Sequence, residues 1–263
     1  MAECFSFSGT YDRWLRFSYS WMGLKSTTTD LSGDGTVMHC WVPKTYKPNK
    51  PNLLLVHGLG ASGMWQWNAF VSRFIERFNV YVPDLLFFGD SYTNRPERTE
   101  QFQAQCVAGV LKAEGVKKTA VVGASYGGFV AYSLAAQFPE MVEKLVLWGA
   151  GVCMEEKDME DGMFQVKSMD EAVSIMLPQT PEKMKELIKV VFYKPVMTIP
   201  TCFMQDFIDV SQRKVTNLSA ARLCFSTLPT NLSLLMPSVQ FSFPLLAKLS
   251  PFLFLIHNGS SYS

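Results

Sequence analysis

The chain has 263 residues, of which 24 are basic, 23 are acidic and 48% are hydrophobic. A net charge of +1 excludes nucleic acid and an anionic membrane surface as the main partner, because neither would be attracted electrostatically. The apolar content supports a sizeable core and excludes bulk disorder. Six scattered cysteines without a CxxC pair favour a reducing compartment, so we predict a cytoplasmic protein with no disulfide scaffold and no metal site.

Neither end of the chain predicts a membrane element. The first residues lack the apolar run of a secretory signal. The most apolar segment, residues 241–256, is shorter than the roughly 20 residues of a spanning helix and contains Lys248 and two prolines. We therefore expect a soluble chain with no stable membrane span, and we treat residues 1–35 as an N-terminal segment without assigned elements.

Between residues 36 and 150, short apolar runs alternate with longer amphipathic stretches. The runs predict strands at residues 37–42, 52–57, 79–83, 119–123 and 144–148. The stretches predict helices at residues 65–78, 99–114 and 126–138. This alternation is typical of an α/β fold with a mostly parallel central sheet, and we assign residues 36–150 to its core.

The pattern changes after residue 150. No run typical of a buried strand occurs between Glu155 and Val210, and helices are expected at residues 168–177 and 181–193. Ser168 lies at a plausible helix N-cap, and Pro181 at a plausible first helical position. We interpret residues 151–210 as a helical insertion that forms a lid over a site.

Residues 211–263 form an atypical tail. No Asp or Glu follows Asp209, so all 23 acidic residues of the chain lie within residues 1–209. The tail is rich in Leu, Ser, Phe and Pro without a repeating period. We hypothesise a retained intron or a shifted reading frame, with an unusual natural tail as the alternative. In either case the late strands of the sheet are expected to be missing or replaced.

A candidate nucleophile follows the strand at residues 119–123. Gly123-Ala-Ser-Tyr-Gly127 lies between this predicted strand and a predicted helix. This is the context of a G-x-S-x-G nucleophile elbow, in which a tight turn presents the Ser125 hydroxyl and small neighbours allow close approach. The alternative is an ordinary glycine-rich turn between a strand and a helix.

A second motif lies about 65 residues earlier. The apolar run that starts at Leu53 ends in His57-Gly58-Leu59-Gly60. A turn here can direct backbone amides toward an oxyanion, and we predict the amides of Leu59 and Tyr126 as its donors. His57 precedes the nucleophile, and we interpret it as a structural residue that braces the loop.

The third motif, Pro83-Asp84-Leu-Leu-Phe-Phe-Gly89-Asp90-Ser91, completes an ordered set. With it the chain resembles the α/β-hydrolase superfamily, in particular the lid-bearing branch of plant esterases and monoacylglycerol lipases, over about residues 35–210. Related epoxide hydrolases and haloalkane dehalogenases place Asp at the nucleophile, so Ser125 indicates acyl transfer. The resemblance implies a serine hydrolase of carboxylic esters, with a small hydrophobic acyl ester or a lipid ester as substrate and without a cofactor. It assigns loop-shaping roles to Asp84 and Ser91.

The chain departs from this family in the partners of the nucleophile. The family's order is Ser, acid, His, with the late partners in Gly-x-x-Asp and Gly-His motifs, and neither motif is present. His257 is either the general base or a chance histidine of the tail. The remaining candidate acids are Glu155, Glu156, Asp158, Asp206 and Asp209. The alternatives to an enzyme are therefore a catalytically dead binding protein and a nonfunctional splice product.

Two tryptophans follow the His-Gly motif closely. Trp65 and Trp67 line an acyl pocket in one interpretation. In the alternative interpretation they pack in the core or against the lid. The sequence does not indicate an oligomeric state.

Overall fold

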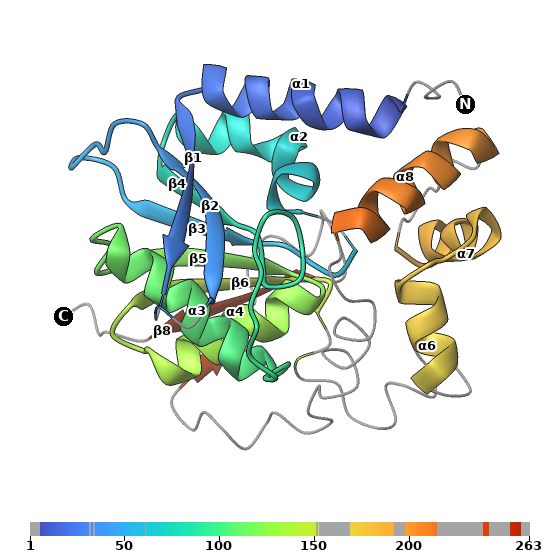
Figure 1. Ribbon diagram of the computed structural model, residues 1–263. Coiled ribbons are helices and arrows are strands. Elements are labelled where there is room, and N and C mark those ends of the chain that lie inside the picture. The colour runs from blue at the N-terminus through green and yellow to red at the C-terminus, as the bar shows by residue number, and fades with distance from the viewer. Residues whose placement is uncertain are drawn as a thin grey trace.

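The computed structural model describes residues 6–31, 33, 35–60, 62–150, 152, 169–191, 198–214, 239–241 and 253–258. Its centre is one sheet with the strand order β1-β2-β4-β3-β5-β6-β8-β7 (Figure 1). The strands are β1 (Leu24–Asp30), β2 (Val37–Pro43), β3 (Asn52–Val56), β4 (Asn79–Pro83), β5 (Thr119–Ala124), β6 (Val142–Trp148), β7 (Val239–Phe241) and β8 (Leu253–Asn258). The central strands β4, β3, β5 and β6 are parallel, whereas β1 and β2 are antiparallel.

Helices cover both faces of the sheet. In Figure 1, α1 (Phe7–Trp21) and α2 (Gly63–Ile75) lie over one face, and α3 (Glu100–Ala113) and α4 (Tyr126–Gln137) lie over the other. Strand β3 contributes alternate side chains to the two cores: Leu53 and Leu55 pack with α1 and α2, and Leu54 and Val56 pack with α3 and α4. Burial on both faces explains its continuous apolar run. The predicted α/β fold is confirmed.

The observed elements agree with the predicted ones between residues 36 and 191, whereas α1, β1, α8 (Thr201–Lys214), β7 and β8 were not predicted from the sequence. All five predicted strands and all three predicted core helices are present with small shifts of their ends, and Thr99 caps α3 through its side chain. Helices α6 (Met169–Met176), α7 (Pro181–Val191) and α8 occupy the described part of residues 151–214. Their role as a lid remains a prediction.

The tail supplies the far edge of the sheet. Strand β8 pairs antiparallel with β6, and β7 pairs antiparallel with β8. The described strands that follow β6 along the chain are thus antiparallel to their neighbours, and the absence of further late strands remains a prediction. No described helix is both long enough and apolar enough to cross a bilayer.

A carboxylate joins α8 to the start of α1, 200 residues earlier in the chain. Asp206 accepts a hydrogen bond of 2.7 Å from the Ser6 hydroxyl and one of 2.6 Å from the Ser8 amide. Phe203 of α8 also contacts Phe7, with ring centroids 4.9 Å apart. A negative charge at a helix N-terminus satisfies unpaired amides and the helix dipole, so this contact holds α1 and α8 together.

We predict that Asp206→Ala destabilises the protein, because the Ser8 amide and the Ser6 hydroxyl at the start of α1 lose their acceptor. Loss of a cap costs about 1–2 kcal/mol, or a fall in Tm of roughly 2–8 °C. Thermal melts monitored by circular dichroism measure this change. The matched control is Asp209→Ala on the same helix, because the Asp209 carboxylate is exposed and bonds to Gln205 within α8. Equal melting of the two variants would contradict the prediction.

Candidate active site

Ser125 lies in a strained turn between β5 and α4. Its φ is 52° and its ψ is −124°, and among the described non-glycine residues only Phe87 shares a positive φ. The turn is fixed on both sides: the Ser125 amide donates to the Trp148 carbonyl (2.8 Å), and the Ser125 carbonyl accepts from the Gly128 amide (2.8 Å). Such strain persists where the surrounding structure determines it, and it is typical of functional sites.

Glycines allow this turn to approach β3. A Cβ on Gly127 would lie 2.4 Å from the His57 carbonyl oxygen and 2.5 Å from that of Val56. A Cβ on Gly123 would lie 2.4 Å from the Gly127 carbonyl oxygen. These positions have no space for a side chain. The G-x-S-x-G spacing therefore packs the elbow directly against the end of β3.

The loop after β3 faces the elbow. A Cβ on Gly58 would lie 3.0 Å from the Ser125 Cβ, and the Gly58 amide donates to the Gln66 side chain (2.8 Å). Leu59 is partly buried against the hydrophobic cluster that contains Tyr126. The structure thus brings together the two segments whose amides, at Leu59 and Tyr126, are the predicted oxyanion hole. Their binding of an oxyanion remains a prediction.

His57 is a structural residue, as the sequence analysis proposed. It is fully buried, and its Nε2 accepts a hydrogen bond from the Leu85 amide (2.8 Å). The proton of the neutral ring therefore lies on Nδ1, which donates to the Gly58 carbonyl (2.7 Å). Burial lowers the pKa of His57, more than the attraction of Asp84 raises it. Both nitrogens are engaged, so His57 braces the loop and has no free position to deprotonate Ser125.

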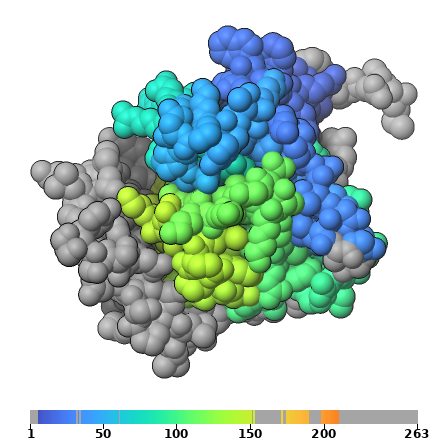
Figure 2. All heavy atoms as spheres, turned by 90° about the vertical axis from the view of Figure 1, so that its left-hand side faces the viewer, coloured from blue at the N-terminus to red at the C-terminus, as the bar shows by residue number. Residues whose placement is uncertain are grey.

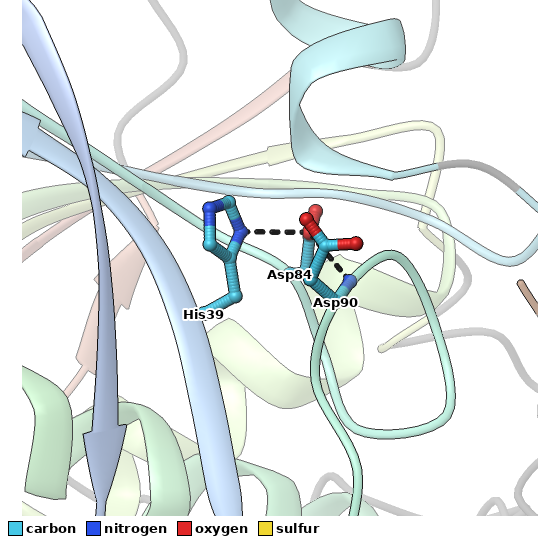
Figure 3. Close-up of side chains that lie close together, drawn as sticks. All are labelled: His39, Asp84 and Asp90. Carbon is cyan, nitrogen blue, oxygen red and sulfur yellow. Dashed lines mark hydrogen bonds and ion pairs between the residues drawn. The ribbon is translucent and has the colours of Figure 1, made fainter. Parts of the chain in front are cut away.

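Asp84 organises the loop that carries the third motif (Figure 3). It is buried, and its carboxylate accepts hydrogen bonds from His39 Nδ1 (2.9 Å) and from the amides of Gly63 (2.8 Å) and Asp90 (3.1 Å). Burial alone would raise the pKa of Asp84, but the hydrogen bonds from His39 and Gly63 and the attraction of the neighbouring imidazoles together hold this pKa below its usual value. The Ser91 hydroxyl donates to the Asp84 carbonyl (2.7 Å). The loop-shaping roles of both residues are confirmed.

His39, Asp84 and Asp90 form a cluster of the kind that can hold a metal ion, because their ligand atoms lie within 4.8 Å of one another. Each side chain already has other partners. His39 Nε2 lies 2.8 Å from the Ser26 hydroxyl, and the Asp90 carboxylate pairs with Arg16 (2.7 Å). A cation would have to displace these contacts. We interpret the cluster as a set of hydrogen bonds that holds β2 against the loop after β4.

The structure does not bring His257 to Ser125. In β8, His257 pairs with Lys144, the third residue of β6, whereas Ser125 bonds to Trp148, the last residue of that strand. Four residues of strand separate these positions, or about 13 Å. The Asp206 carboxylate accepts the hydrogen bonds from Ser6 and Ser8 at the start of α1, and Asp209 is exposed on α8. The other candidate acids, Glu155, Glu156 and Asp158, lie outside the described residues.

The two tryptophans occupy different environments. Trp67 is 1% exposed and packs against Phe70 and Trp148, a position that fits the core alternative. Trp65 is half-buried where α1, α2 and α8 meet. Its Nε1 donates to Asp12 (2.9 Å), and its ring contacts that of Phe207 (5.2 Å between centroids). A role for either residue in binding an acyl chain remains a prediction.

Two glutamines that support the site were missed by the sequence analysis. Gln66 holds the Gly58 amide, and Gln103 bonds to both the amide and the carbonyl of Leu86 (2.9 and 3.2 Å). Each amide side chain replaces a missing backbone partner in a buried loop. Neither lies in a recognisable motif. The available signal was a polar residue within a predicted apolar helix face, which does not identify its partner.

We predict that Ser125→Gly is more stable than Ser125→Ala. Both variants remove the hydroxyl, but only glycine relieves the positive φ of the turn. The strain of such a conformation is about 1–3 kcal/mol, partly offset by the greater entropy of unfolded glycine, so a net gain of about 1 kcal/mol is expected. Chemical denaturation of the two variants measures the difference. A glycine variant no more stable than the alanine variant would show that the turn stores no strain.

We also predict that stability falls when the pH drops from about 7.5 to about 5.5. The folded state holds His57 neutral with a lowered pKa, whereas the unfolded chain binds a proton near pH 6.5. Below that pH the unfolded state carries more protons, so the free energy of unfolding decreases by up to about 1.4 kcal/mol per pH unit. Denaturant melts of the wild type and of His57→Gln test this expectation, because the variant should lose this pH dependence.

A second measurement keeps the pH prediction testable if His57→Gln does not fold. In the wild type, the NMR signal of the His57 ring should remain in its neutral form at pH values where an exposed histidine is protonated. A ring that titrates with an ordinary pKa would contradict the buried, neutral state.

Residues 51–186 match the alpha/beta hydrolase fold family. An uncharacterized protein of Mycobacterium tuberculosis is 30% identical over 126 residues, which cover 48% of this chain and 37% of that protein. The 2-hydroxymuconate semialdehyde hydrolase of Pseudomonas putida is 41% identical over 101 residues, which cover 37% of this chain and 35% of that enzyme. The chain thus spans little more than a third of the length of these curated relatives.

Solved structures show the same fold. A bacterial membrane phospholipase A aligns with a TM-score of 0.65 at 24% identity, over 83% of this chain and 66% of that one. The 2-hydroxy-6-oxo-6-phenylhexa-2,4-dienoate hydrolase of Rhodococcus aligns with a TM-score of 0.61 at 20% identity, over 82% of this chain and 76% of that one. Because the family match covers more than half of the chain and includes the strained Ser125 turn, this protein belongs to the alpha/beta hydrolase fold family.

Proposed function

We propose that this chain carries the nucleophile of a serine hydrolase that acts on carboxylic esters, with Ser125 as the attacking group. The observation that carries the proposal is the strained backbone of Ser125 at the junction of β5 and α4. An ordinary glycine-rich turn has no need of a non-glycine residue in this conformation. In this family the strained turn presents the serine hydroxyl above the sheet, where an acyl carbon can approach.

The surroundings of the elbow favour a hydrophobic acyl group. Leu177, next to α6, is buried in the same cluster as Tyr126, and Leu59 packs against that cluster. A Cβ on Gly60 would lie 3.9 Å from the Met176 carbonyl, so the end of α6 borders the loop after β3. In the proposal, α6 to α8 form the lid, and the amides of Leu59 and Tyr126 stabilise the oxyanion. Such a site needs no cofactor, and we place the protein in the cytoplasm.

No histidine in the described part of the chain is placed to act as the general base of this reaction. The chain has three histidines; His39 and His57 are buried and bonded, and β8 places His257 near the opposite end of β6. A serine without a base is a poor nucleophile at neutral pH. The oxyanion hole and substrate binding alone still leave about 10³–10⁴-fold acceleration over water. We therefore propose slow hydrolysis rather than efficient turnover.

The position of His257 also favours a second candidate, a binding protein that keeps the ester pocket without catalysis. This protein would bind hydrophobic esters and release them unchanged. The third alternative, a nonfunctional splice product, concerns the tail beyond residue 210. Comparison of the transcript with the genomic sequence around codon 210 tests it, because a continuous exon there contradicts a retained intron.

We predict that a fluorophosphonate probe modifies the purified wild-type chain once, at Ser125. The strained turn holds the hydroxyl beside the predicted oxyanion donors. The Ser125 oxygen forms a bond to phosphorus as the P–F bond breaks, fluoride leaves without help from an acid residue, and the hydroxyl proton passes to water. Intact mass spectrometry measures the adduct. Ser125→Ala should remain unmodified. Ser72→Ala, which changes an exposed serine of α2, is the matched control and should react like the wild type.

The outcomes separate the two candidates. Modification of the wild type and Ser72→Ala, but not of Ser125→Ala, supports the hydrolase. A folded wild type that resists the probe but still binds a hydrophobic ester analogue contradicts the hydrolase and supports the binding protein. Modification that persists in Ser125→Ala contradicts the assignment of the nucleophile.

A further inference from the structure

The first helix carries a row of exposed aromatic side chains. Among the described residues, seven large hydrophobic side chains are well exposed, and four of them belong to α1. Two are the most exposed of all, Phe17 at 69% and Trp21 at 81%. A fifth, Phe203 of α8, contacts Phe7. We call this set the aromatic stripe: Phe7, Trp14, Phe17, Trp21 and Phe203.

The stripe occupies one side of α1. At 100° per residue, its four members in α1 fall within an arc of about 80° and extend over about 21 Å of helix. The opposite side of the helix carries Leu15 and Tyr19, which are fully buried in the core shared with α2. The N-terminal segment that includes α1 lies at the top of the molecule in both views (Figures 1 and 2). The fold therefore uses one face of α1 for packing and presents the other to its surroundings.

The exposed charges that α1 and Lys44 place beside the stripe are positive, and the acid nearest to Phe7, Asp206 of α8, accepts hydrogen bonds from Ser6 and Ser8. The single acidic residue of α1, Asp12, is buried, and its carboxylate accepts hydrogen bonds from Trp65 and Arg16. Arg13 is exposed beside Trp14. At the other end of the helix, the Lys44 ammonium bonds to the Ser20 carbonyl (2.6 Å), next to Trp21. Aromatic rings with flanking cations and no exposed acid on the helix match the headgroup region of a phospholipid layer.

The size and shape of the stripe favour lipid over a protein partner. At about 200 Å² per aromatic side chain, the exposed fractions amount to roughly 600 Å². This is less than the roughly 800 Å² that each partner contributes to a standard protein interface. It is nevertheless at the upper end of the patches found on monomers, which are often functional. A narrow, convex row suits a deformable lipid surface, whereas a protein partner would need a matching groove.

We propose that α1 lies in the headgroup region of a zwitterionic phospholipid layer and inserts the aromatic stripe into it. Binding is driven by burial of the rings rather than by net charge, which is only +1. Because Phe203 belongs to α8, the same contact places this helix of the proposed lid at the lipid surface. The inference goes beyond the proposed hydrolase, and vesicle binding requires no turnover, so either proposal can fail without the other.

We predict that the full chain floats with neutral phosphatidylcholine vesicles in a density gradient. The test variant is Phe17→Ser/Trp21→Ser, which removes the two most exposed rings and should weaken binding by about tenfold or more. The matched control is Tyr46→Ser/Tyr92→Ser, which removes two exposed rings outside the stripe and should bind like the wild type. Thermal melts should be unchanged in both variants, because none of these side chains is buried.

Several results would overturn the proposal. One is a wild type that remains unbound, and another is an equal loss of binding in both double variants. A third is binding that needs added phosphatidylserine and disappears at high salt, because it would show electrostatic attraction to an anionic surface. Light scattering addresses a second copy of this chain as the occupant: a wild-type dimer that Phe17→Ser/Trp21→Ser converts to a monomer, without vesicle binding, replaces the lipid proposal.

Discussion

The close contact between the Ser125 turn and the end of β3 is the constraint on which the site depends. Gly127 lies against the carbonyl groups of Val56 and His57, so the two parallel strands β3 and β5 end at the same level. That contact holds Ser125 beside the loop of Gly58 and Leu59. Any side chain at position 127 would separate the nucleophile from the predicted oxyanion donors. The glycines therefore set the distance between the two halves of the site, and the strain at Ser125 follows from it.

Buried hydrogen bonds of His57 and Asp84 support the loops that surround the Ser125 turn. His57 joins the loop after β3 to the loop after β4 through Gly58 and Leu85. Asp84 joins the loop after β4 to β2 and to the start of α2. These side chains are ionisable but buried, and each is stabilised in one protonation state by its partners. The histidine and the carboxylate closest to the motifs thus serve the geometry of the loops and are not available for proton transfer.

The parts of this structure that could be predicted from sequence are those with local signals. Buried parallel strands have continuous apolar runs, and the Ser125 elbow has a fixed spacing of small residues. Helix α1 was not predicted because its buried face is narrow, with Leu15 and Tyr19, and its exposed face also carries aromatic side chains, so apolar residues occur on both sides. The contact of Asp206 with Ser6 and Ser8 spans 200 residues, and no local pattern indicates it.

The direction of one strand decides how far the family's chemistry extends to this chain. A parallel strand beside β6 would end at the same edge as β5, and the loop after it would lie near Ser125. Strand β8 instead runs antiparallel, so its last residues, which include His257, lie near the start of β6. The tail therefore covers the β6 edge of the sheet, but it places His257 at the end of β6 that lies away from Ser125. Protection of a sheet edge requires only backbone pairing, whereas a catalytic base also requires strand direction. In this chain β8 protects the edge of the sheet, but its direction does not bring a histidine to Ser125.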